Sequence, residues 1–191
     1  MTIAKSIDMT MTVCALLFSC LLLPGTSNAQ SPRPVFGMAV FLGSQYGAEH
    51  YGAEIESGKI DAAIAALESD SASSDSAYVR SNNLCVAYIK AKDLEKATDA
   101  CDEAVQQIRT ASETLAEKKY VPRKKRVALR EDLAVALSNQ GVVVALNGDA
   151  EQAEKLFRES IELDRRDKMF KTNLERLSYA PYASNVQASN N

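Results

Sequence analysis

Few residues of this chain have side chains that suit catalysis or metal binding. The 191 residues include one His, His50, four Cys and no Trp. A catalytic base at neutral pH is most often His, and a structural zinc site takes about four Cys or His ligands. His50 has no nucleophile motif such as G-x-S-x-G to accompany it. We therefore expect no catalytic residue, no metal site and no cofactor.

The four cysteines fall into two groups. Cys14 and Cys20 lie in an N-terminal segment that we expect to be removed, which leaves Cys85 and Cys101. These two are far apart in the sequence and form no C-x-x-C motif, so thioredoxin-like exchange is not expected. A disulfide can persist in an exported protein. Because free Cys is among the most buried residue types, we favour two buried thiols over a disulfide.

A basic cluster is the most distinctive local feature. Seven of the 22 Lys and Arg residues fall between residues 118 and 130. Four of them adjoin an expected helix start, where positive charge opposes the helix dipole at a cost of roughly a few tenths of a kcal/mol each. We favour a solvated turn; the alternatives are contact with an anionic membrane surface or an acidic protein. The cluster consists of Lys118, Lys119, Arg123, Lys124, Lys125, Arg126 and Arg130.

The charge of the whole chain indicates that nucleic acid is not the partner. The 22 Lys and Arg residues stand against 25 Asp and Glu residues, which gives a net charge of −3. Binding to a phosphate backbone needs concentrated positive charge without compensating acids. We expect no nucleic-acid binding.

The segment from Met1 to Ala29 has the order of a secretory signal peptide. An uncharged apolar run, Val13–Leu23, follows Lys5 and precedes small residues that end at Ala29. A helix of that length is too short to span a hydrocarbon core of about 30 Å. We expect cleavage near Ala29 and a periplasmic or secreted protein. The alternatives are a start at Met9 or Met11, an uncleaved anchor, and a lipid anchor on Cys20.

A short pattern occurs three times in the interior of the chain. It reads GKIDAAI from residue 58, KDLEKAT from residue 92 and GDAEQAE from residue 148. The alanines in corresponding positions are Ala63, Ala97 and Ala153. The first interval between them matches the tetratricopeptide period of about 34 residues. The second interval is one such period lengthened by an insertion of about six helical turns.

The residues before each turn extend this similarity. Asn83 with Tyr88, and Asn139 with Val144, occupy the Asn and large apolar positions of the family motif. Residues 46–165 therefore resemble the tetratricopeptide-repeat family, although the family's Pro after the second helix is absent. The resemblance implies an all-α fold in which antiparallel helix pairs stack as an α-solenoid.

The insertion lies between the second and third copies of the pattern. Apolar or small residues recur every three or four positions over residues 94–115 and again over 129–141. This spacing predicts an elongated helical hairpin, each helix about three turns longer than usual, with Pro122 at the turn. Further along, Phe170 and Leu177 belong to an apolar stripe that predicts a C-terminal capping helix.

The apolar stretch of residues 35–42, VFGMAVFL, has no counterpart in the repeats. We expect it to pack against the first helix pair. The alternative is that it contacts a partner or exchanges between two copies of the chain.

The resemblance also implies a binding groove. In the family, the first helix of each repeat lines a concave groove that binds a protein or peptide. The register implies that a disulfide between Cys85 and Cys101 would join paired helices and would raise the free energy of unfolding by at most about 3 kcal/mol. It also implies that Asn83 and Asn139 make structural hydrogen bonds. We expect an apolar-faced helix or extended segment as ligand, the alternative being that the ends of the chain cover the groove. The groove residues in this register are Asn82, Val86, Ile89, Ser138, Val142 and Ala145.

These features predict a signal peptide (1–29), an N-terminal extension (30–43), a tetratricopeptide-like repeat domain (44–178) and a disordered tail (179–191). The expected function is non-catalytic: an exported scaffold or adaptor that binds a partner segment in its groove. The alternative is a structural protein of the cell envelope, held at the membrane surface by the basic cluster or by a lipid on Cys20. Its partner, its pathway and its oligomeric state do not follow from the sequence.

Overall fold

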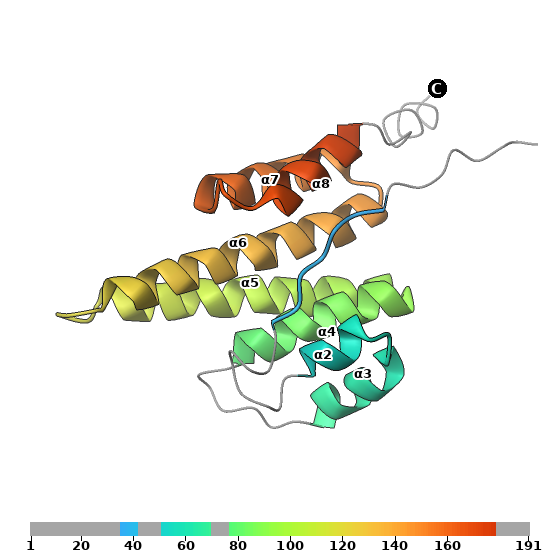
Figure 1. The fold of residues 1–191 in the computed structure, drawn as a ribbon, viewed down its shortest axis with the longest axis horizontal. Helices are drawn as coiled ribbons and strands as arrows, with labels where there is room; N and C mark the ends of the chain where they lie inside the picture. Colours follow the sequence, from blue (N-terminus) through green and yellow to red (C-terminus); the bar gives the residue numbers. More distant parts are fainter. Residues whose placement is uncertain (1–34, 42–50, 70–76, 179–191) are drawn as a thin grey trace, which may run out of the picture. The chain divides into compact units, whose positions relative to one another are not determined.

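The computed structural model describes residues 35–41, 51–69 and 77–178 (Figure 1). Every described residue belongs to one unit, residues 31–191. The expected signal peptide, Cys20, His50 and the tail all lie outside the described residues.

The described part of the chain contains seven helices and no strand, which confirms the predicted all-α class. The helices are α2 (Gly52–Glu56), α3 (Ile60–Ser69), α4 (Ala77–Ala91), α5 (Leu94–Ala116), α6 (Arg123–Leu146), α7 (Ala150–Leu163) and α8 (Lys168–Ser178).

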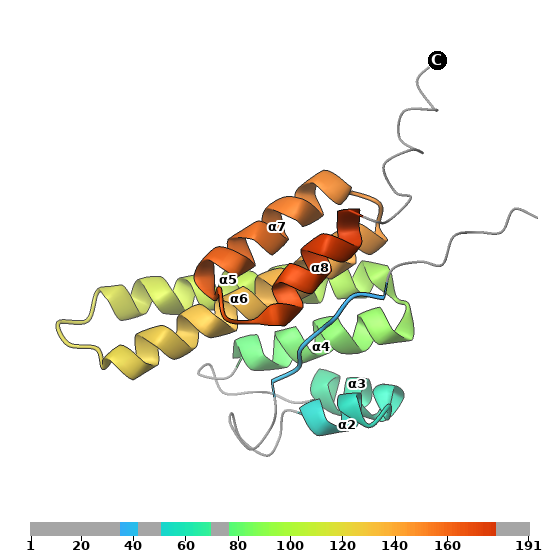
Figure 2. The same ribbon diagram turned by 45° about the horizontal axis from the view of Figure 1, so that its top comes forward.

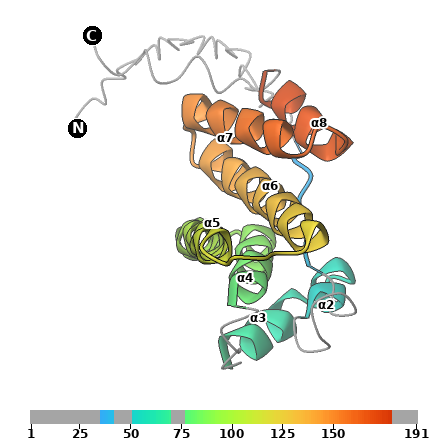
Figure 3. The same cartoon turned by 90° about the vertical axis from the view of Figure 1, so that its left-hand side faces the viewer.

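Each helix packs mainly on the next one along the chain. The most extensive contacts join α4 to α5, α5 to α6 and α6 to α7, with smaller ones from α3 to α4 and from α7 to α8. Figure 3 shows this order, from α2 and α3 through α4, α5 and α6 to α7 and α8. Gly141 lets α6 and α7 approach closely, because a Cβ atom there would lie 2.7 Å from Cε1 of Phe157.

The repeated sequence pattern forms the same turn between α4 and α5 as between α6 and α7. In the first turn Lys92 has φ 65°, and the Asp93 side chain accepts a hydrogen bond from the backbone N–H of Lys96. In the second turn Gly148 has φ 96°, and Asp149 accepts from the backbone N–H of Gln152. A left-handed residue followed by an aspartate N-cap therefore ends one helix and starts the next.

The insertion lengthens α5 and α6 as predicted. The two helices have 23 and 24 residues, and Pro122 is the N-cap of α6. Ala104, Ile108 and Leu137 belong to a buried cluster between them. Figures 1 and 2 show the turn that joins α5 to α6 extending beyond the ends of α4 and α7.

A disulfide joins α4 to α5. It links Cys85 and Cys101, whose Cα atoms are 4.9 Å apart and which are both buried. The preference for two free thiols was therefore wrong. Burial alone could not distinguish the two states, whereas the close packing of the two helices brings the cysteines within the separation that a disulfide requires.

Removing this disulfide should destabilise the helical unit. The bond closes a loop of about 15 residues, for which loop-closure entropy predicts about 3 kcal/mol. We expect the Cys85→Ala/Cys101→Ala variant, and the wild type in dithiothreitol, to lose about that much free energy of unfolding in a urea titration. Equal urea midpoints for the oxidised and reduced wild type would contradict the disulfide.

Candidate functional site

Residues 35–41, here called the strap, lie across three helices that are far apart in the sequence. The strap hydrogen-bonds to α8, then α6, then α4 as it runs from its N-terminal to its C-terminal end. Figure 2 shows it as the blue segment that passes these helices. The expectation that this stretch packs against the first helix pair covers only part of its contacts. Its apolar side chains join a core cluster that includes Ile55 and Leu67 of α2 and α3, but its hydrogen-bond partners lie on α4, α6 and α8.

Three buried asparagines bind the main chain of the strap, one at every second strap residue. Asn173 accepts from the N–H of Gly37 at 2.7 Å and donates to its carbonyl at 2.8 Å. Asn139 makes the same pair with Ala39, at 3.2 and 2.8 Å. Asn83 makes it with Phe41, at 2.8 and 2.9 Å. Each amide thus satisfies both main-chain polar groups of one residue.

Two of the predicted groove residues support these asparagines. The Asn82 side chain donates to the carbonyl of Ala39 at 3.2 Å and accepts from Nδ2 of Asn139 at 2.9 Å. The hydroxyl of Ser138 accepts from Nδ2 of Asn173 at 3.2 Å. All five polar side chains are fully buried, so each depends on its partners in the fold.

Aromatic residues fix both ends of the strap. Phe36 is 6% exposed and stacks on Phe157 with 6.0 Å between ring centroids. Phe41 is 5% exposed and meets Tyr78 edge to face, also at 6.0 Å. The Tyr78 hydroxyl donates to Oδ2 of Asp132 at 2.9 Å, which orients the ring. Burial, then the negative charge of Asp132, raises the pKa of Tyr78, so this hydroxyl remains a donor at neutral pH.

The structure brings all six predicted groove residues into the buried interior beside the strap. Val86, Ile89, Val142 and Ala145 belong to the same core cluster as Phe36, and Met38 and Val40 pack against that cluster. Asn82 and Ser138 join the hydrogen bonds described above. The surface assigned to a partner is therefore occupied by the chain itself.

Sequence reasoning missed Asn173, although its position carried a signal. The interval from Asn139 to Asn173 equals that from Ala63 to Ala97, and the interval from Asn83 to Asn139 equals that from Ala97 to Ala153. Asn173 therefore has the register of a further first helix, and α8 supplies a strap contact as well as covering the core. Asn83 and Asn139 do make hydrogen bonds, and their partners include the strap residues Phe41 and Ala39.

The basic cluster lies away from the strap contacts. Its seven side chains are exposed around the α5–α6 turn and the first two turns of α6, whereas the residues of α6 that hydrogen-bond to the strap or to its asparagines begin at Ser138. In the part of the chain that the structure describes, none of the seven forms an ion pair or a side-chain hydrogen bond.

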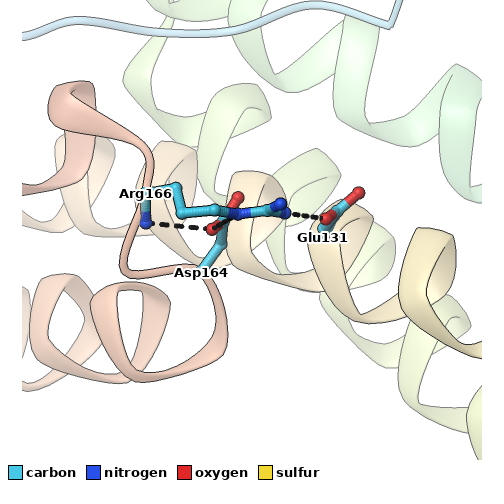
Figure 4. Close-up of polar contacts among 3 residues, drawn as sticks. All are labelled: Glu131, Asp164 and Arg166. Atoms are coloured by element: carbon cyan, nitrogen blue, oxygen red, sulfur yellow. Dashed lines mark hydrogen bonds and ion pairs between the residues drawn. The ribbon is translucent and has the colours of Figure 1, made fainter.

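The remaining polar network near α6 has a structural role. Arg166 contacts both Glu131 and Asp164, with 3.2 Å from its Nε to Oδ1 of Asp164 (Figure 4). Burial alone would raise the pKa of Asp164, but the hydrogen bonds and charge of Arg166 outweigh it and lower the pKa. Every charge in this group is paired, so it ties the α7–α8 turn to α6 and leaves no free acid or base.

Two kinds of site are absent from residues 35–41, 51–69 and 77–178. No group of three or more His, Cys, Asp or Glu side chains there could hold a metal ion. None of the helices in these ranges is long and apolar enough to cross a membrane.

Comparison of the chain with models of known protein families, with curated proteins and with solved structures finds no match.

Replacing one strap asparagine should destabilise the fold far more than replacing an exposed one. In Asn139→Ala the part-buried N–H of Ala39 loses its hydrogen-bond partner and the Ala39 carbonyl keeps the bond from Asn82, which together with the loss of the buried amide costs about 2 kcal/mol. Asn147→Ala, in the exposed turn after α6, is the matched control and should change the free energy of unfolding by less than about 0.5 kcal/mol. Urea titration measures both. Equal losses in the two variants would mean that the strap contributes little to stability.

Proposed function

We propose that this chain is an exported protein-interaction module that binds an extended segment of another protein by its main chain. The observation that carries the proposal is the pairing of Asn83, Asn139 and Asn173 with the N–H and carbonyl groups of alternate strap residues. We call the surface that these three side chains and their neighbours form the strap site.

Main-chain pairing suits a site that accepts an extended ligand from elsewhere. Every non-proline residue carries the same N–H and carbonyl, so three asparagines at a fixed spacing select extended backbone. Side-chain pockets then select the sequence. The pattern that the strap itself presents is an aromatic residue at each end, with Gly37 and Ala39 between them.

A small residue is needed at the position of Gly37 in such a ligand. A Cβ atom on Gly37 would lie 2.7 Å from Cγ of Met169, so a larger residue there must displace this side chain. Phe36 and Phe41, in contrast, are almost completely buried against aromatic partners. The preferred ligand is therefore a segment with two aromatic residues five positions apart and a small residue directly after the first of them.

The strap acts in this proposal as an internal competitor. A segment tethered within the same chain has an effective concentration in the millimolar range. A partner segment must therefore bind more tightly than the strap, or be presented at high local concentration, to replace it. Segments that bind the strap site more weakly than the strap therefore cannot replace it.

The repeat architecture supports an assignment to tetratricopeptide-like modules. Two successive helix pairs share one turn geometry, and the interval from Asn139 to Asn173 is one repeat period of about 34 residues. The Cys85–Cys101 disulfide supports export, because disulfides persist in oxidising compartments. The apolar run before Ala29 supports the same conclusion.

A labelled peptide with the sequence of residues 35–41 tests the proposal on the unit of residues 31–191. We expect weak binding to the wild type and binding at least about tenfold tighter in Phe36→Ser/Phe41→Ser, because these changes weaken the internal competitor. Adding Asn139→Leu to that variant should abolish binding. Fluorescence anisotropy measures all three.

Two N-methylated peptides serve as matched controls. Methylation at the positions of Gly37 and Ala39 removes the N–H groups that donate hydrogen bonds to the asparagine side chains, so this peptide should not bind. Methylation at the positions of Met38 and Val40 alters N–H groups that make no hydrogen bond with a described residue, so binding should persist. Equal binding of both peptides, or no gain in the strap variant, would refute the proposed site.

A further inference from the structure

The end of the α5–α6 hairpin, here called the basic tip, carries charge that the fold leaves unbalanced. The tip comprises the seven residues of the basic cluster, together with the turn of residues 117–122. Glu117 is the single acidic residue among residues 117–130. Since the whole chain has a net charge of −3 and the seven cations supply +7, all the other residues together carry −10. The charge of the chain is therefore uneven, with a local excess of positive charge at one end of one hairpin and a net negative charge on the remaining residues.

The cations surround the helix end instead of lining one face. Arg123, Lys124, Lys125 and Arg126 are consecutive residues at the start of α6. Successive residues of an α-helix are about 100° apart, so these four point to all sides of the helix. The first turn contains no acidic residue, and Pro122 provides no side-chain cap. The partial positive charge of the helix N-terminus therefore adds to that of the side chains.

Apolar groups accompany this charge. Tyr120 is 83% exposed in the turn, which makes it one of the two large hydrophobic side chains exposed among the described residues. Close by, a cavity of about 260 Å³ opens between α5 and α6. Leu115, Leu129 and Leu133 line it, and Arg126 and Arg130 are also among its lining residues.

We infer that the basic tip docks end-on onto an anionic phospholipid bilayer. A flat anionic surface can contact cations on all sides of a helix end at once, whereas a protein partner on one face of the hairpin would reach only some of them. Tyrosine is favoured at the boundary between headgroups and acyl chains, which suits Tyr120. The cavity places an apolar space beside two guanidinium groups. The apolar space can hold the acyl chain of a lipid, and the guanidinium groups can pair with the phosphate of the same lipid.

Docking by the tip leaves the strap site free to act. On α6 the last tip residue is Arg130, and the residues that hydrogen-bond to the strap or to its asparagines begin two helical turns later at Ser138. The negative charge of the rest of the chain is repelled by the same bilayer, which favours the end-on orientation. The inference is independent of the proposed peptide binding and can fail or hold without it.

Vesicle flotation of the unit of residues 31–191 tests the inference. We expect binding to vesicles that contain phosphatidylglycerol, no binding to pure phosphatidylcholine vesicles, and release at about 1 M salt, where the screening length is about 3 Å. Each basic residue near an anionic surface strengthens binding by about fivefold. Changing Arg123, Lys124, Lys125 and Arg126 to Glu should therefore weaken binding at least about 100-fold. Glu is favoured in the first turn of a helix, so this variant should keep its helix content by circular dichroism.

A control variant separates the tip from overall charge. It changes Lys59, Lys90, Arg165 and Lys171 to Glu, four exposed residues outside the tip that make no described ion pair. The change in net charge is the same, and we expect most of the binding to remain. Equal loss of binding in both variants, or no binding of the wild type to anionic vesicles at low salt, would overturn the inference.

Tryptophan fluorescence locates the contact. Because the chain has no Trp, Tyr120→Trp places a single reporter at the tip, and Ser178→Trp places one at the end of α8. Anionic vesicles should shift the emission of the first variant to shorter wavelength and leave the second unchanged. A shift in the α8 variant alone, or in neither variant, would show that the tip does not enter the bilayer.

Discussion

The pairing of the strap with three buried asparagines is the constraint on which the arrangement of α4, α6 and α8 depends. Asn83, Asn139 and Asn173 each place a polar amide in the interior, where it must be hydrogen-bonded. The strap supplies an N–H and a carbonyl to each amide at a fixed spacing of two residues. Helices that are not neighbours in the sequence are thereby held in one register, and the aromatic contacts of Phe36 and Phe41 fix the ends.

Periodicity in the sequence predicted the helices well, because amphipathic stripes and turn residues are local signals. The long α5–α6 hairpin, the turn at Pro122 and the final helix all follow from such patterns. The position of the strap could not be predicted in this way, since a short apolar stretch without a repeat can pack on any apolar face. The spacing of Asn173 from Asn139 is the signal for it in the sequence, because this spacing equals one repeat period and lies outside the turn motifs. The disulfide was also missed, because it depends on how two helices approach each other.

Helix α6 carries two surfaces of opposite chemistry. Its N-terminal turns present Arg123, Lys124, Lys125 and Arg126 to solvent, whereas its C-terminal half buries Ser138 and Asn139 under the strap. The first arrangement favours a long-range electrostatic contact that salt weakens. The second favours short-range main-chain pairing beside the buried core, which salt affects little. One hairpin can therefore hold a charged surface and a peptide site at separate places.

Amide hydrogen exchange of the strap tests the central claim most directly. NMR on the unit of residues 31–191 can follow the five amides from Gly37 to Phe41 one by one. The asparagine pairing predicts an alternating pattern, in which the N–H groups of Gly37, Ala39 and Phe41 are protected and those of Met38 and Val40 exchange much faster. Fast exchange at all five positions, or equal protection at all five, would contradict the account.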